Sequence, residues 1–189
     1  MATQKDLFMK QYVAQYIAGK DGKPMDNVIS GWTRLLPCNW FIKTKNHSHS
    51  EIGWKMIDVL GDGKDGYLFF SAASRMGGEG TKAGTRFIMA SELFDHPERW
   101  DIYERDVNQS DVIDSFNRCW QEVGKPYDWF GVLLGFVSPG ILASWLGRKT
   151  WYCSEVVYYA LTGKVKRISP RRLGWWLEKN GFKKIESLK

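Results

Sequence analysis

The stretch TWYCSEVVYYALTG, residues 150–163, places a cysteine at the start of a predicted helix. Thr150 can cap this helix and Gly163 can end it, so that Cys153 falls at its third position. There, the free N–H groups and the helix dipole favour a thiolate, which is a strong nucleophile at neutral pH. The apolar residues that bury the helix behind the sulfur are Val156, Val157, Ala160 and Leu161. Cys153 is therefore a candidate nucleophile. The same local sequence is also compatible with a cysteine that packs in the core as a small hydrophobic residue.

The order of predicted elements is one helix, then strands, then helices, which indicates an α+β domain. A helix is predicted over 7–18, and residues 1–27 then form an N-terminal helix and polar loop ahead of the main unit, 28–189. Strand-like runs separated by turn signals lie at about 28–36, 39–44, 49–60, 67–73, 85–89 and 99–106. Later helices are predicted over 111–123, with Ile113, Phe116, Trp120 and Val123 on one side, and over 170–180, with Ser169 as N-cap and Pro170 first.

Composition and charge fit one ordinary domain with a basic tail. The chain has 189 residues, of which 43% are hydrophobic and 25% are charged. Residues 163–189 carry 9 Lys/Arg and 2 Asp/Glu. Such a tail suits an anionic cell-wall polymer or an anionic lipid, or is simply a solvated face. Because no nucleic-acid-binding motif accompanies the charge, no specific nucleic acid is predicted as a partner.

The cysteines and the apolar segments indicate the expected location. Cys38, Cys119 and Cys153 show no CxxC spacing, which suits a reducing compartment. Residues 1–23 lack a secretory signal, so we expect a cytoplasmic protein, released by lysis if a virus encodes it. The uncharged stretch 129–147 is divided by Ser138-Pro139-Gly140 into halves too short to span a bilayer. We expect two short buried helices there, with a membrane-dipping hairpin as the alternative.

A thiolate nucleophile needs a base, and two of the three histidines lie together in TKNHSHSEIGW. In a strand, His47, His49 and Glu51 point to the same face. Histidine can take and return a proton at neutral pH. The HxH pattern would also suit a metal on a barrel strand. However, no second carboxylate–histidine pair follows and His96 is isolated, so no metal or other cofactor is expected.

Five motifs in order resemble the papain-like amidase superfamily typified by the NlpC cell-wall peptidases. They are SHSEI (48–52), GYLFFSAASRMGG (66–78), GKPYDWFG (124–131), WYCSEVV (151–157) and ISPRRLGWWLEK (168–179). The histidine precedes the cysteine, as in the circularly permuted branch that includes lecithin:retinol acyltransferase-like proteins. The resemblance covers roughly residues 30–180 and implies a small antiparallel sheet or half-barrel packed against helices.

The resemblance also implies roles for five residues. Cys153 would be the nucleophile, and His49 the general base and later the acid. The third polar residue of the family matches Ser71, where many members carry His, Asp, Glu or Asn. Because serine adds no negative charge beside the imidazole, Glu51 is a candidate substitute. Tyr127 matches the family tyrosine near the oxyanion site, and the Cys153 N–H would be a second donor.

The expected activity is that of a cysteine hydrolase or acyltransferase working through a thioester. The first-choice substrate is an amide of a cell-wall peptide. The second is an acyl ester or lipid, which the aromatic composition and the apolar stretch 129–147 slightly favour, with peripheral membrane contact. One alternative is a catalytically inactive binding or inhibitory module on the same fold, suggested by Ser71. The other is a basic-tail binder of anionic surfaces, whose affinity would fall with salt.

Overall fold

The computed structural model describes residues 8–18, 46–56, 66–73, 83–128 and 150–188. Within these residues six strands form one antiparallel sheet in the order β4-β3-β2-β1-β5-β6. The strands are β1 (Phe8–Ile17), β2 (His47–Met56), β3 (Gly66–Ala73), β4 (Gly84–Met89), β5 (Trp100–Asn108) and β6 (Lys183–Ile185). The helices are α2 (Ala90–Leu93), a short 3-10 helix (Pro97–Arg99), α3 (Gln109–Gln121), α6 (Cys153–Thr162) and α7 (Pro170–Lys179).

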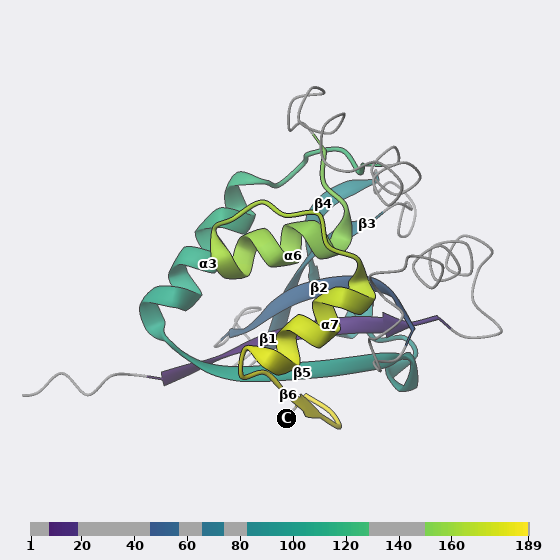
Figure 1. Cartoon of the computed structure of the whole chain (residues 1–189), viewed down its shortest axis with the longest axis vertical. Helices are drawn as coiled ribbons and strands as arrows, with labels where there is room; N and C mark the ends of the chain where they lie inside the picture. The colour runs from purple at the N-terminus through teal and green to yellow at the C-terminus, as the bar shows by residue number, and fades with distance from the viewer. Residues whose placement is uncertain (1–7, 19–45, 57–65, 74–82, 129–149, 189) are drawn as a thin grey trace, which may run out of the picture.

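Helices α3, α6 and α7 pack on one face of the sheet (Figure 1), which confirms the predicted α+β class. The main core fills the space between the two layers. Its buried contributors include Val13, Ile52, Trp54 and Phe70 from the strands, and Val156, Val157, Leu173 and Leu177 from the helices. The helices owe their place to apolar stripes that the sheet removes from water.

A smaller cluster covers the opposite face of the sheet. Its buried members are Tyr12, Ala14, Phe69 and Ile102, and Trp100 packs against them. Because side chains alternate along a strand, Ile52 and Trp54 of β2 face the helices and the intervening positions face this cluster. Gly53 is one of them, and a Cβ there would lie 2.5 Å from the Phe69 ring. Glu51, two residues before Gly53, points to the same face of the sheet as Gly53.

The predicted N-terminal helix over 7–18 is wrong, because residues 8–17 form the strand β1 between β2 and β5. Tyr12 and Tyr16, four residues apart, share a face in a helix and in a strand alike, so their spacing did not discriminate. Gln11 and Gln15 look like solvent-facing residues in the sequence. Both are buried and hydrogen-bonded: Gln11 donates to Ser115 Oγ at 2.8 Å, and Gln15 donates to the Pro170 carbonyl at 2.7 Å.

The predicted strands at 49–60, 67–73, 85–89 and 99–106 are confirmed as β2 to β5 with shifted bounds. The predicted strands at 28–36 and 39–44 and the two helices within 129–147 lie outside the described residues. The short strand β6 was not predicted. No helix in the described part of the chain is long and apolar enough to cross a membrane.

The predicted side of α3 is wrong in part. Phe116 packs against the core, but Ile113, Trp120 and Val123 are exposed, and the buried positions are Val112, Ser115 and Cys119. Ser115 accepts hydrogen bonds from Gln11 and from Trp54, so a polar residue lies at the centre of this contact. A hydrophobic pattern cannot reveal such a contact. By contrast, α7 starts as predicted: Pro170 is first and Ser169 Oγ accepts from the Arg172 N–H at 3.2 Å.

Candidate active site

The helix that carries the candidate nucleophile begins at Cys153 itself. The two residues before it are extended, because Trp151 is bridged to the segment at Tyr127. The Trp151 N–H donates to the Pro126 carbonyl at 3.1 Å, and the Asp128 N–H donates to the Trp151 carbonyl at 2.9 Å. The predicted start at residue 151 and the predicted Thr150 cap are therefore wrong, and Cys153 occupies the first helical position rather than the third.

The start of α6 places backbone N–H groups that lack a partner within the helix next to Cys153. The first bond within the helix runs from the Val156 N–H to the Tyr152 carbonyl at 3.1 Å. The N–H groups of Cys153, Ser154 and Glu155 precede it, and such groups favour negative charge at a helix N-terminus. The helix ends at Gly163, as predicted, in the left-handed conformation with φ of 69°.

Both neighbours of Cys153 fasten the start of α6 to the segment before α7. Ser154 Oγ donates to the Ile168 carbonyl at 2.6 Å. The Tyr152 hydroxyl lies 2.6 Å from both the carbonyl and the N–H of Ile168. These bonds are buried, so they fix where the sulfur points.

The structure brings His49 and Cys153 together. His49 lies on β2, and its Nε2 is 2.9 Å from Glu51 Oε1. Burial opposes charge on the imidazole and lowers its pKa. The charge of Cys153, a hydrogen bond to its sulfur and the Glu51 carboxylate outweigh burial and raise the pKa of His49 to about 10. At neutral pH His49 therefore carries a proton beside the sulfur, and a protonated imidazole in that place stabilises a thiolate.

The pairing of two strands ends beside this pair. Strands β2 and β3 are paired only from Met56↔Gly66 to Ile52↔Phe70. Strands β3 and β4 stay paired as far as Ala73↔Gly84. Glu51, the next residue of β2, is nevertheless buried. The His49 side chain is 22% exposed, whereas Cys153 is 2% exposed.

Tyr127 is a second group at the sulfur. Its side chain is buried and hydrogen-bonds to Cys153. Burial, and then the charge of Cys153, raise the pKa of Tyr127 well above its ordinary value. Tyr127 therefore remains a neutral phenol, which can donate its O–H to a negative sulfur or oxygen. This is the position predicted from the motif GKPYDWFG.

The two candidates for the third polar residue of the site, Glu51 and Ser71, differ in what they contact. Glu51 contacts the imidazole directly and supplies a carboxylate. Ser71 is buried on β3, opposite Arg86 of β4. No hydrogen bond joins Ser71 to His49 within the described residues. The geometry therefore places Glu51, and not Ser71, against the imidazole.

His47 does not share the face of His49, so that prediction is wrong. Tyr16 pairs with His49 and Ile17 pairs with His47, which leaves Ser48 as the extra residue of a β-bulge. His47 is fully buried and its Nε2 lies 3.0 Å from Asp101 Oδ2. The bulge breaks the alternation on which the prediction depended.

The other described cysteine, Cys119, and the exposed His96 show no activated setting. Burial raises the pKa of the Cys119 thiol well above its ordinary value, which disfavours the reactive thiolate. Cys38 lies outside the described residues. His96 is exposed, 3.5 Å from Glu98. Within the described ranges, no group of three or more His, Cys, Asp and Glu residues is placed to hold a metal ion.

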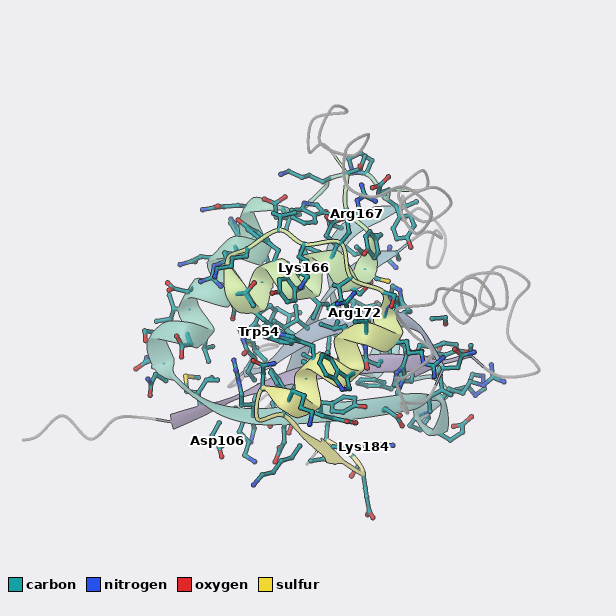
Figure 2. The ribbon with its side chains drawn as sticks, in the orientation of Figure 1. Trp54, Asp106, Lys166, Arg167, Arg172 and Lys184 are labelled. Carbon is teal, nitrogen blue, oxygen red and sulfur yellow. The ribbon has the colours of Figure 1, made fainter. Side chains whose placement is uncertain are left out.

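Part of the basic tail is engaged in internal ion pairs. Figure 2 labels Lys166, Arg167, Arg172 and Lys184, which come from α7 and the segments on either side of it. Arg167 pairs with Asp128 at 2.9 Å, and its guanidinium lies 5.8 Å from the centre of the Tyr152 ring. Lys184 pairs with Asp101 at 2.7 Å. These cations support the fold beside the candidate site, a role that the charge count did not reveal.

Sequence reasoning also missed Glu122, at the end of α3. Its carboxylate accepts the indole N–H of Trp151 and pairs with Lys125. It thereby holds the residue two positions before the nucleophile. No sequence signal could have found it, because Glu122 lies in a different motif from Trp151.

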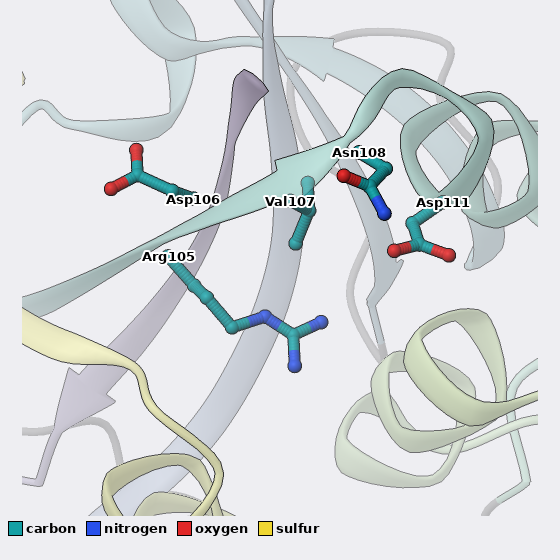
Figure 3. Close-up of a pocket in the computed structure, with 5 residues that line it drawn as sticks. All are labelled: Arg105, Asp106, Val107, Asn108 and Asp111. Carbon is teal, nitrogen blue, oxygen red and sulfur yellow. The ribbon is translucent and has the colours of Figure 1, made fainter. Parts of the chain in front are cut away.

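A shallow pocket lies elsewhere in the molecule (Figure 3), lined by Arg105, Asp106, Val107, Asn108 and Asp111. On β1, Gln11 pairs with Arg105, whereas Tyr16 pairs with His49. The pocket is therefore displaced along β1 from the Cys153–His49 pair and does not belong to it.

Cys153, His49, Glu51 and Tyr127 thus form one connected group at the start of α6, and Ser71 lies on the next strand. Comparison with known proteins adds no identity to this group: no protein-family model, no curated protein and no solved structure matches the chain.

Proposed function

We propose that this protein is a cysteine hydrolase or acyltransferase of the circularly permuted papain-like kind. One observation carries the proposal: the Cys153 sulfur, at a helix start, hydrogen-bonds to His49, which in turn contacts Glu51. A nucleophile, a base and a group that orients the base are the three parts that this chemistry needs. The antiparallel sheet with the cysteine helix packed on it supports the same fold family.

The proposed first half-reaction forms a thioester. The Cys153 thiolate attacks an amide or ester carbonyl, so that a C–S bond forms and the carbonyl oxygen takes the negative charge. In this proposal the Cys153 N–H and the Tyr127 O–H stabilise that oxygen. Protonated His49 then gives its proton to the leaving amine or alcohol as the C–N or C–O bond breaks.

The second half-reaction returns the enzyme to its starting state. His49, now neutral, takes a proton from water or from an acceptor alcohol or amine. The resulting nucleophile attacks the thioester carbonyl, and the sulfur leaves as a thiolate beside the protonated imidazole. Glu51 keeps the imidazole oriented and favours its charged form throughout. The first-choice substrate is an amide bond in a cell-wall peptide, and the second is an acyl ester.

Alkylation of the full chain tests the nucleophile. Iodoacetamide labelling followed by mass spectrometry should modify Cys153 much faster than Cys119 at neutral pH. Hydrolysis of muropeptides and of p-nitrophenyl acyl esters then assigns the substrate class, with Cys153→Ala as the inactive variant and Cys119→Ser as the matched control. Equal and slow labelling of both cysteines would remove Cys153 as a nucleophile.

One observation favours the second candidate, an inactive binding module on the same fold: Cys153 is only 2% exposed. The two functions respond differently to Cys153→Ala. If the biological effect of the protein survives this change, catalysis is not its function.

A further inference from the structure

Arg86, on β4, is a partly buried guanidinium for which the described residues supply no acidic partner. Its Nη1 is shielded from solvent and has no hydrogen-bond partner, and none of the ion pairs among the described residues includes it. Other arginines near the helices have at least one acceptor: Arg118 donates to the Ala160 carbonyl, and Arg167 donates from Nη2 to Asp128 although its Nη1 is also without a partner. A charged donor removed from water without an acceptor is costly, so its presence points to an acceptor that binds there.

The position of Arg86 relates it to the candidate active site. Arg86 lies directly opposite Ser71 in the pairing of β3 with β4, so the two side chains share a face of the sheet. Glu51, which contacts His49, lies on the adjacent strand β2 at the point where β2 and β3 part. Two strand spacings, about 10 Å, separate β4 from β2. An elongated substrate held at the sulfur could thus present an anionic group to Arg86.

The chemistry of the two residues indicates what they bind. A guanidinium presents a planar fork that matches a carboxylate, and the Ser71 hydroxyl can add a further donor. The Glu51 carboxylate lies on the β2 side, where protonated His49 offsets its charge, so the anion belongs on the β4 side of Ser71. One guanidinium and one hydroxyl suit a singly charged carboxylate better than a doubly charged phosphate.

We infer that Arg86 binds a carboxylate of the acyl donor, so that Cys153 acts on an acidic amide or ester rather than on a neutral one. The inference rests on the proposed function, because it names the substrate class of the same site. Ser71, which is buried and does not contact His49, thereby belongs to substrate binding.

A matched pair of alkylating probes tests the inference on the full chain. N-(iodoacetyl)glycine carries a carboxylate, and N-(iodoacetyl)glycinamide has the same reactive carbon without the charge. Rates of Cys153 alkylation are measured by mass spectrometry at low ionic strength, because salt screens such charges. The wild-type chain should react with the acidic probe about tenfold faster than with the neutral probe.

Arg86→Gln should abolish this preference, and Arg86→Lys should keep part of it because a charge remains. Lys183→Gln is the control, since it removes the same charge from β6, at the opposite edge of the sheet from β4, and should leave the preference intact. Arg86→Lys also keeps the test valid if Arg86→Gln proves unstable in thermal unfolding.

Three outcomes would overturn the inference. The acidic probe shows no preference in the wild-type chain, Arg86→Gln keeps the wild-type ratio, or inorganic phosphate protects Cys153 more strongly than acetate does. The last result would assign the site to phosphate. Failure of the proposed function is distinguishable, because the neutral probe would then label Cys153 no faster than Cys119.

Discussion

The coupling between His49 and Cys153 gives the sharpest prediction. Replacing Cys153 with alanine removes both the charge and the hydrogen bond that most raise the pKa of His49, which stands at about 10 against an ordinary 6.5. A hydrogen bond to a charged group contributes about 1.5–3 kcal/mol. That energy corresponds to about one to two pH units. Cys153→Ala should therefore lower the pKa of His49 by about this amount, while Glu51 keeps it from falling further.

The titration can be followed by NMR of the histidine ring carbons and nitrogens. At pH 9 the imidazole of His49 should be protonated in the wild-type chain and largely neutral in Cys153→Ala. Cys119→Ala is the matched control, because Cys119 is buried in α3 and does not contact His49. An identical His49 titration in wild type and Cys153→Ala would refute the contact between the two side chains and the mechanism built on it.

Three further perturbations concern catalysis and stability. Glu51→Gln should lower kcat/KM for an activated ester by about 100-fold. It should also move the alkaline limb of the pH profile of kcat/KM to lower pH, because Glu51 raises the pKa of His49. Ser71→Ala should leave that limb in place. Because the pKa of His49 is raised in the folded state, the protonated imidazole stabilises the fold fully below pH 6.5, and this stabilisation is lost as pH rises towards 10. In urea titrations, the free energy of unfolding of His49→Gln should therefore fall less over that pH range than that of the wild-type chain. In urea titrations, Gly174→Ala should lower the free energy of unfolding by about 1–3 kcal/mol, because a Cβ would lie 2.5 Å from Gln15 Oε1. An unchanged urea midpoint would contradict the close packing of α7 on β1.

The parts of the fold that sequence predicted are those with a local signal. Strands β2 to β5 alternate and are bounded by glycine-rich turns, and α7 has its cap and its proline. The His49–Cys153 pair was reached through motif order. The remaining features of the fold depend on how the sheet packs. The burial of Gln11 and Gln15 and the Ser115 contact of α3 depend on partners far away in the chain, so no local pattern could have indicated them.

The details of the candidate site show the same division. The closeness of Cys153 and His49 could be predicted, but the helix position of Cys153 could not, because the bridge to Tyr127 sets it. The bulge at Ser48 separates His47 from His49 without any mark in the sequence. The choice of Glu51 over Ser71 depends on where β2 and β3 part, which is a property of the whole sheet.

The bridge between Tyr127 and Trp151 also ties the position of the nucleophile to α3 and β4. Asp128 and Trp151 are joined by a backbone hydrogen bond, and the Lys125 carbonyl accepts from the Thr85 N–H at 2.9 Å. A disturbance at Thr85 should therefore reach Cys153 through the backbone, although the two residues lie far apart in the sequence.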